Sequence, residues 1–301
     1  MHPVFLRRRG TWALARLTVL LGLFVLAHIA RAQLPNFAVT ARHNIEYGEA
    51  NGEKLLLDVY TPEQATGPLP AVIMVHGGGW VSGDKSDFKG DGLARYGFVV
   101  FSVNYRLANN PADVYPAAYD DVQRSVRWVR AHAAEYNVDP KRVGAFGASA
   151  GGHLVALLGT TDTRDNSDPD LAAYSSRVNC VVDLFGPTDF DPTLKASDEA
   201  HQIVLKFLGA TPEDNPAVYT AASPINHIDA KTVPFLIFHG QDDPLVPVDQ
   251  SQRFYNALIQ NGTEAKLTIF PGEGHGFTKP ADNLEMVTEA VRFIVSHLGN
   301  R

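Results

Sequence analysis

The chain has 301 residues, of which 45% are hydrophobic and 20% are charged, and its formal net charge is −7. This composition is typical of a globular protein and excludes a mainly disordered chain. The acidic balance gives no support to nucleic-acid binding, which needs a basic face, and the single Cys180 excludes an internal disulfide.

The first 32 residues have the order of a cleavable secretory signal peptide. Three arginines occupy positions 7–9, an apolar stretch covers residues 17–29, and Ala-Arg-Ala at 30–32 matches the A-x-A cleavage pattern. An uncleaved membrane anchor is the alternative, but the apolar stretch is short for a span of roughly 20 residues. We therefore expect residues 1–32 to be a signal peptide and residues 33–301 to form one domain that is secreted or periplasmic, without stable membrane insertion after processing.

Short apolar segments recur along the rest of the chain. Residues 54–60 alternate apolar and polar side chains, as in a strand near the edge of a sheet. Continuous apolar runs suit strands that are covered on both faces of a parallel sheet. Six segments have this character: residues 71–75, 98–103, 143–146, 178–185, 234–238 and 267–270.

Helical patterns separate these apolar runs. Residues 122–133 carry apolar side chains at intervals of three and four, and residues 249–259 and 284–298 are also helix-like. This alternation predicts an α/β fold with a mostly parallel central sheet and helices on both faces. Residues 187–233 are less periodic, with short helical pieces such as 201–208. We interpret them as a small cap insertion, with a long surface loop as the alternative.

Residues 147–151, Gly-Ala-Ser-Ala-Gly, match the pattern G-x-S-x-G between a predicted strand and a predicted helix. In that context a sharp turn holds the serine in a strained conformation, with its hydroxyl exposed above the sheet. The alternative is a plain glycine-rich turn, which leaves the strand and helix on either side unexplained. Ser149 is therefore the candidate nucleophile.

The sequence His-Gly-Gly-Gly-Trp at 76–80 directly follows the apolar run at 71–75. Acyl transfer builds negative charge on a carbonyl oxygen, and preorganised backbone N–H groups stabilise that charge. Glycines let the main chain approach a substrate closely. We expect the N–H groups of Gly77 or Gly78, together with that of Ala150, to form an oxyanion hole. A phosphate-binding loop is the alternative, but the pattern G-x-G-x-x-G is absent.

A serine hydroxyl needs a base to take its proton. When the chain order is serine, acid, histidine, His275 is the histidine that lies late enough in a suitable loop, after the strand predicted at 267–270. The acid is expected in the loop after the strand predicted at 234–238, where Asp242 and Asp243 both stand. These residue types in this order predict a serine hydrolase.

Five segments together resemble the hormone-sensitive-lipase-like α/β-hydrolases, and more closely the branch that contains bacterial feruloyl and acetylxylan esterases. They are the 76–80 segment, Asn-Tyr-Arg at 104–106, Gly-Ala-Ser-Ala-Gly-Gly at 147–152, His-Gly-x-x-Asp at 239–243 and Gly-His-Gly at 274–276. Many lipase-like members have Asp where this chain has Ala148, so the narrower branch fits better. The resemblance runs from about residue 45 to the C-terminus and implies an α/β-hydrolase fold with no cofactor and no metal.

The resemblance also assigns the acid to Asp243, and Pro244 supports this because a following proline holds Asp243 in an extended conformation. By the same comparison, Arg106 and Asp121 are expected to pair and brace the loops behind the site. We expect His76, Trp80, Tyr105 and Phe277 to contact substrate, with a place in the core as the alternative for the last three.

The expected activity is hydrolysis of carboxylic esters through an acyl-enzyme. The expected substrates are small-molecule or polysaccharide-linked esters, either with short acyl groups or of the acetyl and feruloyl types of plant cell walls. An amide hydrolase such as an arylformamidase is one alternative. A prolyl-oligopeptidase-type peptidase is another, but the chain ahead of residue 45 is too short for its β-propeller. A binding-only member of the fold is disfavoured because the serine, the histidine and the glycine loop are all present.

Overall fold

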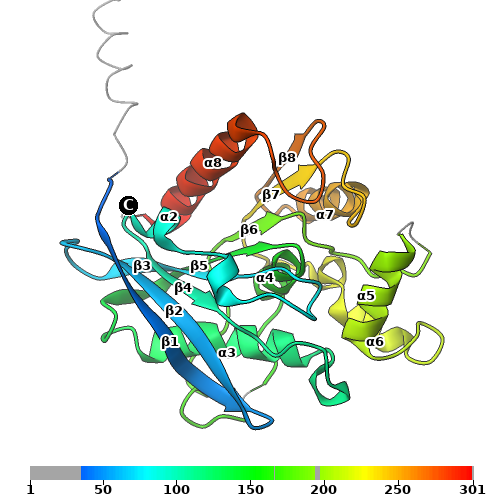
Figure 1. Ribbon diagram of the computed structural model, residues 1–301, viewed down its shortest axis with the longest axis horizontal. Coiled ribbons are helices and arrows are strands. Elements are labelled where there is room, and N and C mark those ends of the chain that lie inside the picture. The colour runs from blue at the N-terminus through cyan, green and yellow to red at the C-terminus, as the bar shows by residue number, and fades with distance from the viewer. Residues whose placement is uncertain (1–34, 166, 194–196, 300–301) are drawn as a thin grey trace, which may run out of the picture. The chain divides into compact units, whose positions relative to one another are not determined.

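An eight-stranded sheet organises the chain (Figure 1). The computed structural model describes residues 35–165, 167–193 and 197–299, so the signal peptide predicted over residues 1–32 lies outside them. The strand order is β1-β2-β4-β3-β5-β6-β7-β8. The first two strands run antiparallel to their neighbours and the other pairs are parallel, which confirms the predicted fold class. The strands are β1 (Val39–Ala50), β2 (Glu53–Pro62), β3 (Leu69–Val75), β4 (Val99–Val103), β5 (Val138–Ala148), β6 (Val181–Leu184), β7 (Phe235–Gly240) and β8 (Ala265–Phe270).

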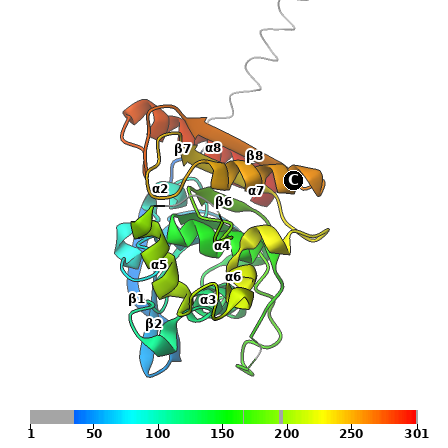
Figure 2. The same ribbon diagram turned by 90° about the vertical axis from the view of Figure 1, so that its right-hand side faces the viewer.

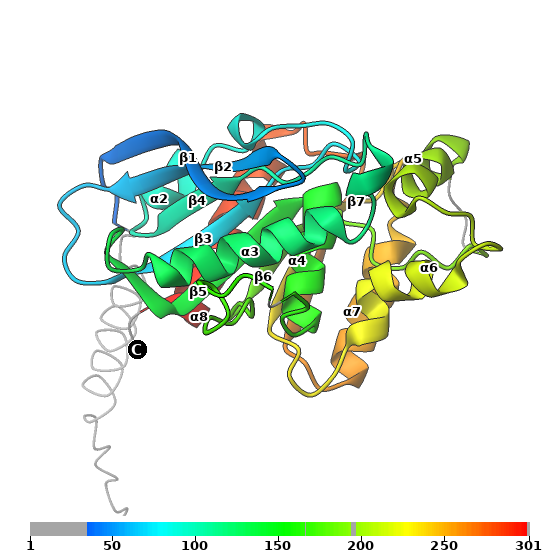
Figure 3. The ribbon, with the colours of Figure 1, turned by 90° about the horizontal axis from the view of Figure 1, so that it is seen from below.

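Helices cover both faces of the sheet. Figure 3 shows α3 (Ala117–Ala131), α4 (Ala150–Thr160) and α7 (Asp249–Gln260) in front of it. On the other face lie α8 (Pro280–Leu298), which packs on β5 and β7, and the short α2 (Asp91–Ala94), which packs on β2 and β4. Three 3₁₀ helices complete the connections: η1 (Lys85–Asp87), η2 (Pro111–Asp113) and η3 (Pro224–His227).

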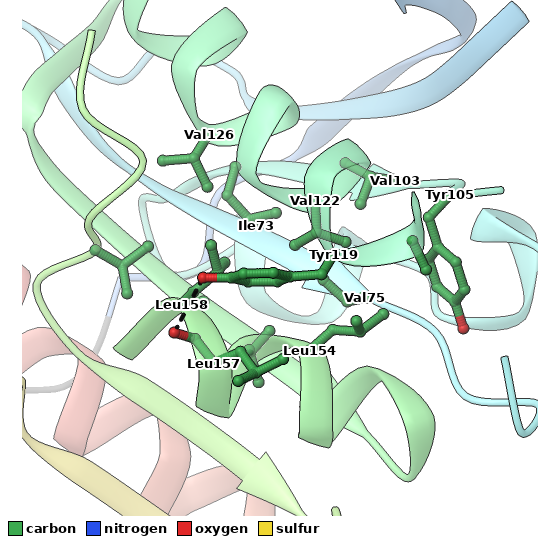
Figure 4. Close-up of a cluster of buried hydrophobic side chains, with 14 of the residues drawn as sticks. Ile73, Val75, Val103, Tyr105, Tyr119, Val122, Val126, Leu154, Leu157 and Leu158 are labelled. Atoms are coloured by element: carbon green, nitrogen blue, oxygen red, sulfur yellow. Dashed lines mark hydrogen bonds between the residues drawn. The ribbon is translucent and has the colours of Figure 1, made fainter. Parts of the chain in front are cut away.

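The largest cluster of apolar side chains lies between the sheet and the helices α3 and α4 (Figure 4). Side chains from β3 pack there against one face of α3, as the helical spacing predicted, and the hydroxyl of Tyr119 donates a hydrogen bond to the carbonyl of Leu157 at 3.3 Å. Burial of this apolar surface stabilises the fold and fixes the ends of β3 and β5, from which the glycine loop and Ser149 follow. Its members include Ile73, Val75, Val103, Tyr119, Val122, Val126, Leu154, Leu157 and Leu158.

The edge strand β1 was not predicted. Eleven of its twelve residues keep some exposure and only Tyr47 is buried, so neither face leaves an apolar pattern in the sequence. Two register shifts interrupt its pairing with β2, and such bulges break the alternation of side chains further. The strand predicted at residues 54–60 is therefore the second strand of the sheet, inside the edge.

Residues 187–233 form the predicted cap in place of a long loop. Their two helices are α5 (Asp198–Leu208) and α6 (Pro216–Ala222), which Figure 2 shows beside each other in front of α4. Asn215 caps the start of α6, and Gly209 ends α5 with a left-handed backbone. Across the three described ranges of the chain, no helix has both the length and the apolar character needed to cross a membrane.

Candidate active site

Three side chains from separate loops meet at one end of the sheet. Ser149 follows β5, Asp243 follows β7, and His275 follows β8. The Nε2 atom of His275 lies 2.8 Å from Oγ of Ser149, and its Nδ1 atom lies 2.7 Å from Oδ2 of Asp243. Carboxyl ends of parallel strands lie at the same edge of a sheet, which explains how residues 126 and 32 positions apart come into contact.

The turn around Ser149 needs its flanking glycines. Ser149 has φ 55° and ψ −121°, a conformation that side chains with a Cβ rarely adopt. A Cβ on Gly147 would lie 2.2 Å from the carbonyl oxygen of Gly151, and one on Gly151 would lie 2.1 Å from that of Val75. The turn is held in place by the Ser149 N–H, which donates to the carbonyl of Leu184 at 2.8 Å. The strained serine that the motif predicts is therefore present.

The structure brings Asp243, and not Asp242, to the imidazole of His275. The Oδ1 atom of Asp243 accepts hydrogen bonds from the N–H groups of Leu245 and Val246, both at 2.9 Å, and its side chain has no exposed surface. Burial alone raises the pKa of this carboxyl, but hydrogen bonds from His239 and His275 outweigh it and place the pKa well below its usual value. Asp243 is therefore ionised, whereas the neighbouring Asp242 is exposed.

A second carboxylate fixes the loop that carries His275. The buried Glu273 accepts hydrogen bonds from the N–H and hydroxyl of Thr278, both at 2.9 Å, and from the N–H of Lys279 at 2.7 Å. These hydrogen bonds lower its pKa to about 2. Sequence reasoning missed this role, and the only signal was an acidic residue between two glycines.

The glycine loop lies directly against the turn of Ser149. A Cβ on Gly77 would lie 3.0 Å from the carbonyl oxygen of Ala148 and 3.2 Å from Cβ of Ser149, so this close approach requires glycine. The hydroxyl of Tyr105 donates to the carbonyl of His76 at 3.1 Å, and Nδ1 of His76 lies 2.7 Å from the carbonyl of Gly77. In a trans peptide the N–H points opposite to the C=O. The N–H groups of Gly77 and Gly78 therefore point away from His76 and Tyr105.

This arrangement corrects two of the four predicted substrate contacts, His76 and Tyr105, whereas Phe277 is only partly buried and its contact stays a prediction. His76 and Tyr105 are 2% and 4% exposed and stack on each other with ring centroids 4.4 Å apart, behind the glycine loop. Phe277 packs against Phe185 and Phe270. Of the four, only Trp80 lines the cavity beside Ser149. The aromatic character of these residues did not distinguish a substrate contact from a buried support.

A cavity of about 760 Å³ opens between the catalytic side chains and the cap. Gly77, Gly78, Ala150, Ser149 and His275 lie on one side of it, and residues of α5 lie on the other. The cap comes close to the glycine loop, because a Cβ on Gly79 would lie 2.9 Å from Cγ2 of Ile203. Most of the lining is apolar, with acidic residues among it, as the following members show: Trp80, Phe185, Phe190, Ile203, Leu205, Tyr219, Leu245, Val246, Asp189, Asp191 and Glu213.

The predicted pair of Arg106 and Asp121 is present behind the site. Nε and Nη2 of Arg106 donate to the two carboxylate oxygens of Asp121 at 2.8 and 2.7 Å, and the backbone N–H of Arg106 donates to the same carboxylate at 2.8 Å. This bidentate pair links the chain after β4 to α3. Arg106 follows Tyr105 directly, so the pair fixes the segment that supports the glycine loop.

Comparisons with known proteins agree with this geometry. A family model, BD-FAE, matches residues 57–258. The chain is 34% identical over 228 residues to LipM of Mycobacterium tuberculosis, described as a probable carboxylic ester hydrolase, and the match covers 71% of this chain and 50% of LipM. The chain spans about half to two thirds of the length of the mycobacterial esterases that it matches.

Solved structures are similar over more of their length. A truncated carbohydrate esterase from gut microbiota matches with a TM-score of 0.77 and 28% identity, over 89% of this chain and 99% of that one. Butyrate-bound Est2, an esterase of the planctomycete Thermogutta terrifontis, matches with a TM-score of 0.73 and 26% identity, over 89% and 98% of the two chains. The family match covers more than half of the sequence. The chain belongs to the BD-FAE family of α/β-hydrolase-fold esterases.

Proposed function

We propose that this protein is a serine carboxylesterase in which Ser149, His275 and Asp243 are the catalytic triad. The observation that carries the proposal is the continuous chain of hydrogen bonds from Ser149 through His275 to Asp243. These side chains lie at an apolar cavity, with the glycine loop directly beside the serine. Nucleophile, base and orienting acid are thus within hydrogen-bond distance of one another, which is the geometry that nucleophilic catalysis needs.

Each residue then has a defined role in the reaction. Oγ of Ser149 attacks the ester carbonyl carbon while Nε2 of His275 takes its proton, and Asp243 stabilises the resulting imidazolium. The oxyanion is stabilised by the N–H groups of Gly77, Gly78 and Ala150, three residues that line the cavity. Those of Gly77 and Gly78 point away from His76 and Tyr105, which hold the carbonyl groups of the same peptides. His275 then gives the proton to the leaving alcohol. Water repeats the sequence on the acyl-enzyme and regenerates the free serine.

The proposed substrates are esters with short acyl groups, or the acetyl and feruloyl esters of the kind found in plant cell walls. The butyrate-bound Est2 supports a small acyl group, and the related carbohydrate esterase supports an ester carried by a carbohydrate. The cap also supports it, because its two short helices offer limited apolar cover for a long chain. An apolar cavity accepts the acyl or aromatic part of such an ester, while a polysaccharide part extends into solvent.

Kinetics of the purified protein on a series of p-nitrophenyl esters test this function. We expect kcat/KM to be higher for acetate and butyrate than for palmitate, and acetylated or feruloylated xylan to release acid. Ser149→Ala should lose nearly all turnover and remain folded, since the serine is the attacking group. Faster turnover of a matched formamide than of the ester would assign the protein to the amide hydrolases instead. Turnover retained by Ser149→Ala would overturn the mechanism.

We also propose that residues 1–32 are removed as a signal peptide and that the domain acts outside the cytoplasm. The basic start, the apolar stretch and the A-x-A pattern support this. N-terminal sequencing of protein recovered from the exported fraction should start at or near Gln33. An intact Met1 in the membrane fraction would favour an anchor.

A further inference from the structure

A second histidine lies behind the catalytic acid, away from the cavity. His239 is the fifth residue of β7 and has no exposed surface. Its Nδ1 atom lies 2.7 Å from Oγ of Ser251 on α7, and its Nε2 atom lies 2.8 Å from the carbonyl oxygen of Val246. The same Nε2 atom is 3.3 Å from Oδ2 of Asp243. The imidazole thus joins β7, α7 and the loop of the catalytic acid.

These contacts define the tautomer of His239. A backbone carbonyl can only accept a hydrogen bond, so Nε2 next to Val246 must carry the proton. In the neutral imidazole, Nδ1 then has a lone pair, which accepts the hydroxyl proton of Ser251. Ser251 is also fully buried, so no water competes for this bond. The N–H of Nε2 is consequently shared between the carbonyl of Val246 and the carboxylate of Asp243.

The carboxylate oxygen that receives this N–H is the one that faces His275. Oδ1 of Asp243 is already occupied by the N–H groups of Leu245 and Val246. Oδ2 lies 2.7 Å from Nδ1 of His275 on one side and 3.3 Å from Nε2 of His239 on the other. Rotation of the carboxylate would break hydrogen bonds at both oxygens. A donor on each side of Oδ2 therefore fixes its direction.

We infer that His239 is a positioning residue that acts through Asp243, holding Oδ2 in place for His275, and that Ser251 sets its tautomer. This inference rests on the proposed triad. His239 does not line the cavity and touches no reacting atom. Its effect therefore falls on the chemical step and leaves substrate binding unchanged. Asp183 of β6 is the other carboxyl that interacts electrostatically with His239, and its Oδ2 atom has no hydrogen-bond partner.

Two substitutions of similar size separate this role from simple packing. The amide nitrogen of Gln in His239→Gln reaches the place of Nε2 and keeps a donor for Val246 and Asp243. The shorter Asn in His239→Asn reaches only the place of Nδ1, beside Ser251, and leaves Asp243 without that donor. We expect His239→Gln to keep kcat within about threefold of wild type. We expect His239→Asn to lower kcat by about tenfold to a hundredfold. Losses of this size are typical when a residue that orients a metal-binding side chain is replaced, and His239 orients Asp243 in a similar way.

Both variants should keep KM within about threefold of wild type, because residue 239 does not line the cavity. Active-site titration and thermal unfolding must show that each variant is folded. Equal kcat values for the Gln and Asn variants, or a loss that appears in KM, would overturn the role of His239. Turnover that survives in Ser149→Ala would instead overturn the proposed triad, so the two failures are distinguishable.

If His239→Asn does not fold, an NMR measurement on the wild-type protein tests the same contact between His239 and Asp243. The Nε2 proton of His239 is followed by NMR with ¹⁵N-labelled histidine, before and after an organophosphate reacts with Ser149 and leaves His275 protonated. Its resonance should shift, because it shares Oδ2 of Asp243 with His275. His153 is the internal control: it is equally buried, but its Nε2 faces only the carbonyl of Ala222, at 2.7 Å. An unchanged His239 resonance, or an equal shift for His153, would overturn the inference.

Discussion

The two sides of the cavity are built in different ways. On the catalytic side, hydrogen bonds fix the direction of each polar group, as with the carboxylate of Asp243 and the carbonyls of His76 and Gly77. The cap is also attached by hydrogen bonds, such as that from the N–H of Tyr115 to the carbonyl of Phe207 at 2.8 Å. Towards the cavity, however, it presents apolar side chains such as Ile203, and Phe207 of α5 stacks on Trp80 with ring centroids 4.1 Å apart. Hydrogen bonds fix the orientation of polar groups, whereas the packing of apolar side chains fixes the volume left for a substrate. We therefore expect the catalytic side to determine the reaction and the cap to determine which esters enter.

The largest effect should come from removing the charge of the catalytic acid. Asp243→Asn keeps the shape of the side chain but allows the wrong tautomer of His275, so we expect kcat to fall by two orders of magnitude or more, with little change in stability. Steady-state kinetics at one pH measure this. Asp242→Asn is the matched control, because Asp242 is exposed and only its backbone N–H is used, in a bond to the carbonyl of Glu273 at 2.9 Å. Its kcat should stay within about tenfold of wild type, and the reverse ranking would transfer the role to Asp242.

Removing one support of the glycine loop should have an intermediate effect. Tyr105→Phe deletes the hydroxyl that holds the carbonyl of His76 and leaves the ring stack with His76 in place. The N–H groups of Gly77 and Gly78 then lose part of their orientation. We expect kcat to fall by about tenfold, less than the hundredfold or more for loss of an oxyanion donor itself, with KM unchanged. A rise in KM at constant kcat would mean that Tyr105 contacts substrate.

On the cap side, a substitution should change selectivity rather than chemistry. Ile203→Ala removes apolar volume opposite Gly79, so longer acyl groups gain space. We expect the ratio of kcat/KM for hexanoate to that for acetate to rise by about threefold to tenfold, the effect of one or two methylene groups in an apolar pocket. Turnover of acetate should change little. Equal losses on both esters would show that the cap also positions the catalytic groups.

The smallest effect on activity is expected for a substitution of Asp183 in β6, which should change stability instead. Burial raises the pKa of this carboxyl to about 6. The folded protein thus retains a proton that the unfolded chain loses near pH 4, so stability falls as pH rises from about 4 to about 6, and the loss is complete above that. Asp183→Asn keeps the acceptor for the N–H of Gly186, which bonds Oδ1 at 2.9 Å. We expect it to unfold with about 1–3 kcal/mol more free energy than wild type at pH 8 and with little difference at pH 4.

Chemical denaturation at the two pH values tests this prediction for Asp183, and the esterase rate should change less than about twofold. A variant that is less stable than wild type at pH 8 would show that the carboxylate makes a favourable interaction in its ionised form.

The catalytic side was largely predictable from sequence, since each of its parts needs residues that few alternatives replace. Ser149 requires glycines at 147 and 151 because a Cβ would collide with backbone on both sides. The acid was ambiguous between Asp242 and Asp243 until the resemblance and the proline after Asp243 were considered. In the cap, the helical piece predicted at 201–208 lies within α5, whereas α6 was not predicted, because it is short and has few buried side chains.

The errors concern residues whose type suits more than one environment. His76 and Tyr105 have the aromatic character of a binding pocket, but they are buried supports of the glycine loop. Glu273 accepts hydrogen bonds from Thr278 and Lys279 of its own loop, and His239 contacts Ser251 of α7. Neither residue type nor spacing indicates these contacts in the sequence. Edge strand β1 left no pattern because so little of it is buried.

The left-handed backbone of Ser149 also bears on how this protein can evolve. A non-glycine residue held at φ 55° costs the folded state on the order of 1–3 kcal/mol. Replacement by glycine removes that cost together with the nucleophile. Selection for stability alone would therefore favour loss of this serine. We expect Ser149 to be retained only where hydrolysis itself is under selection.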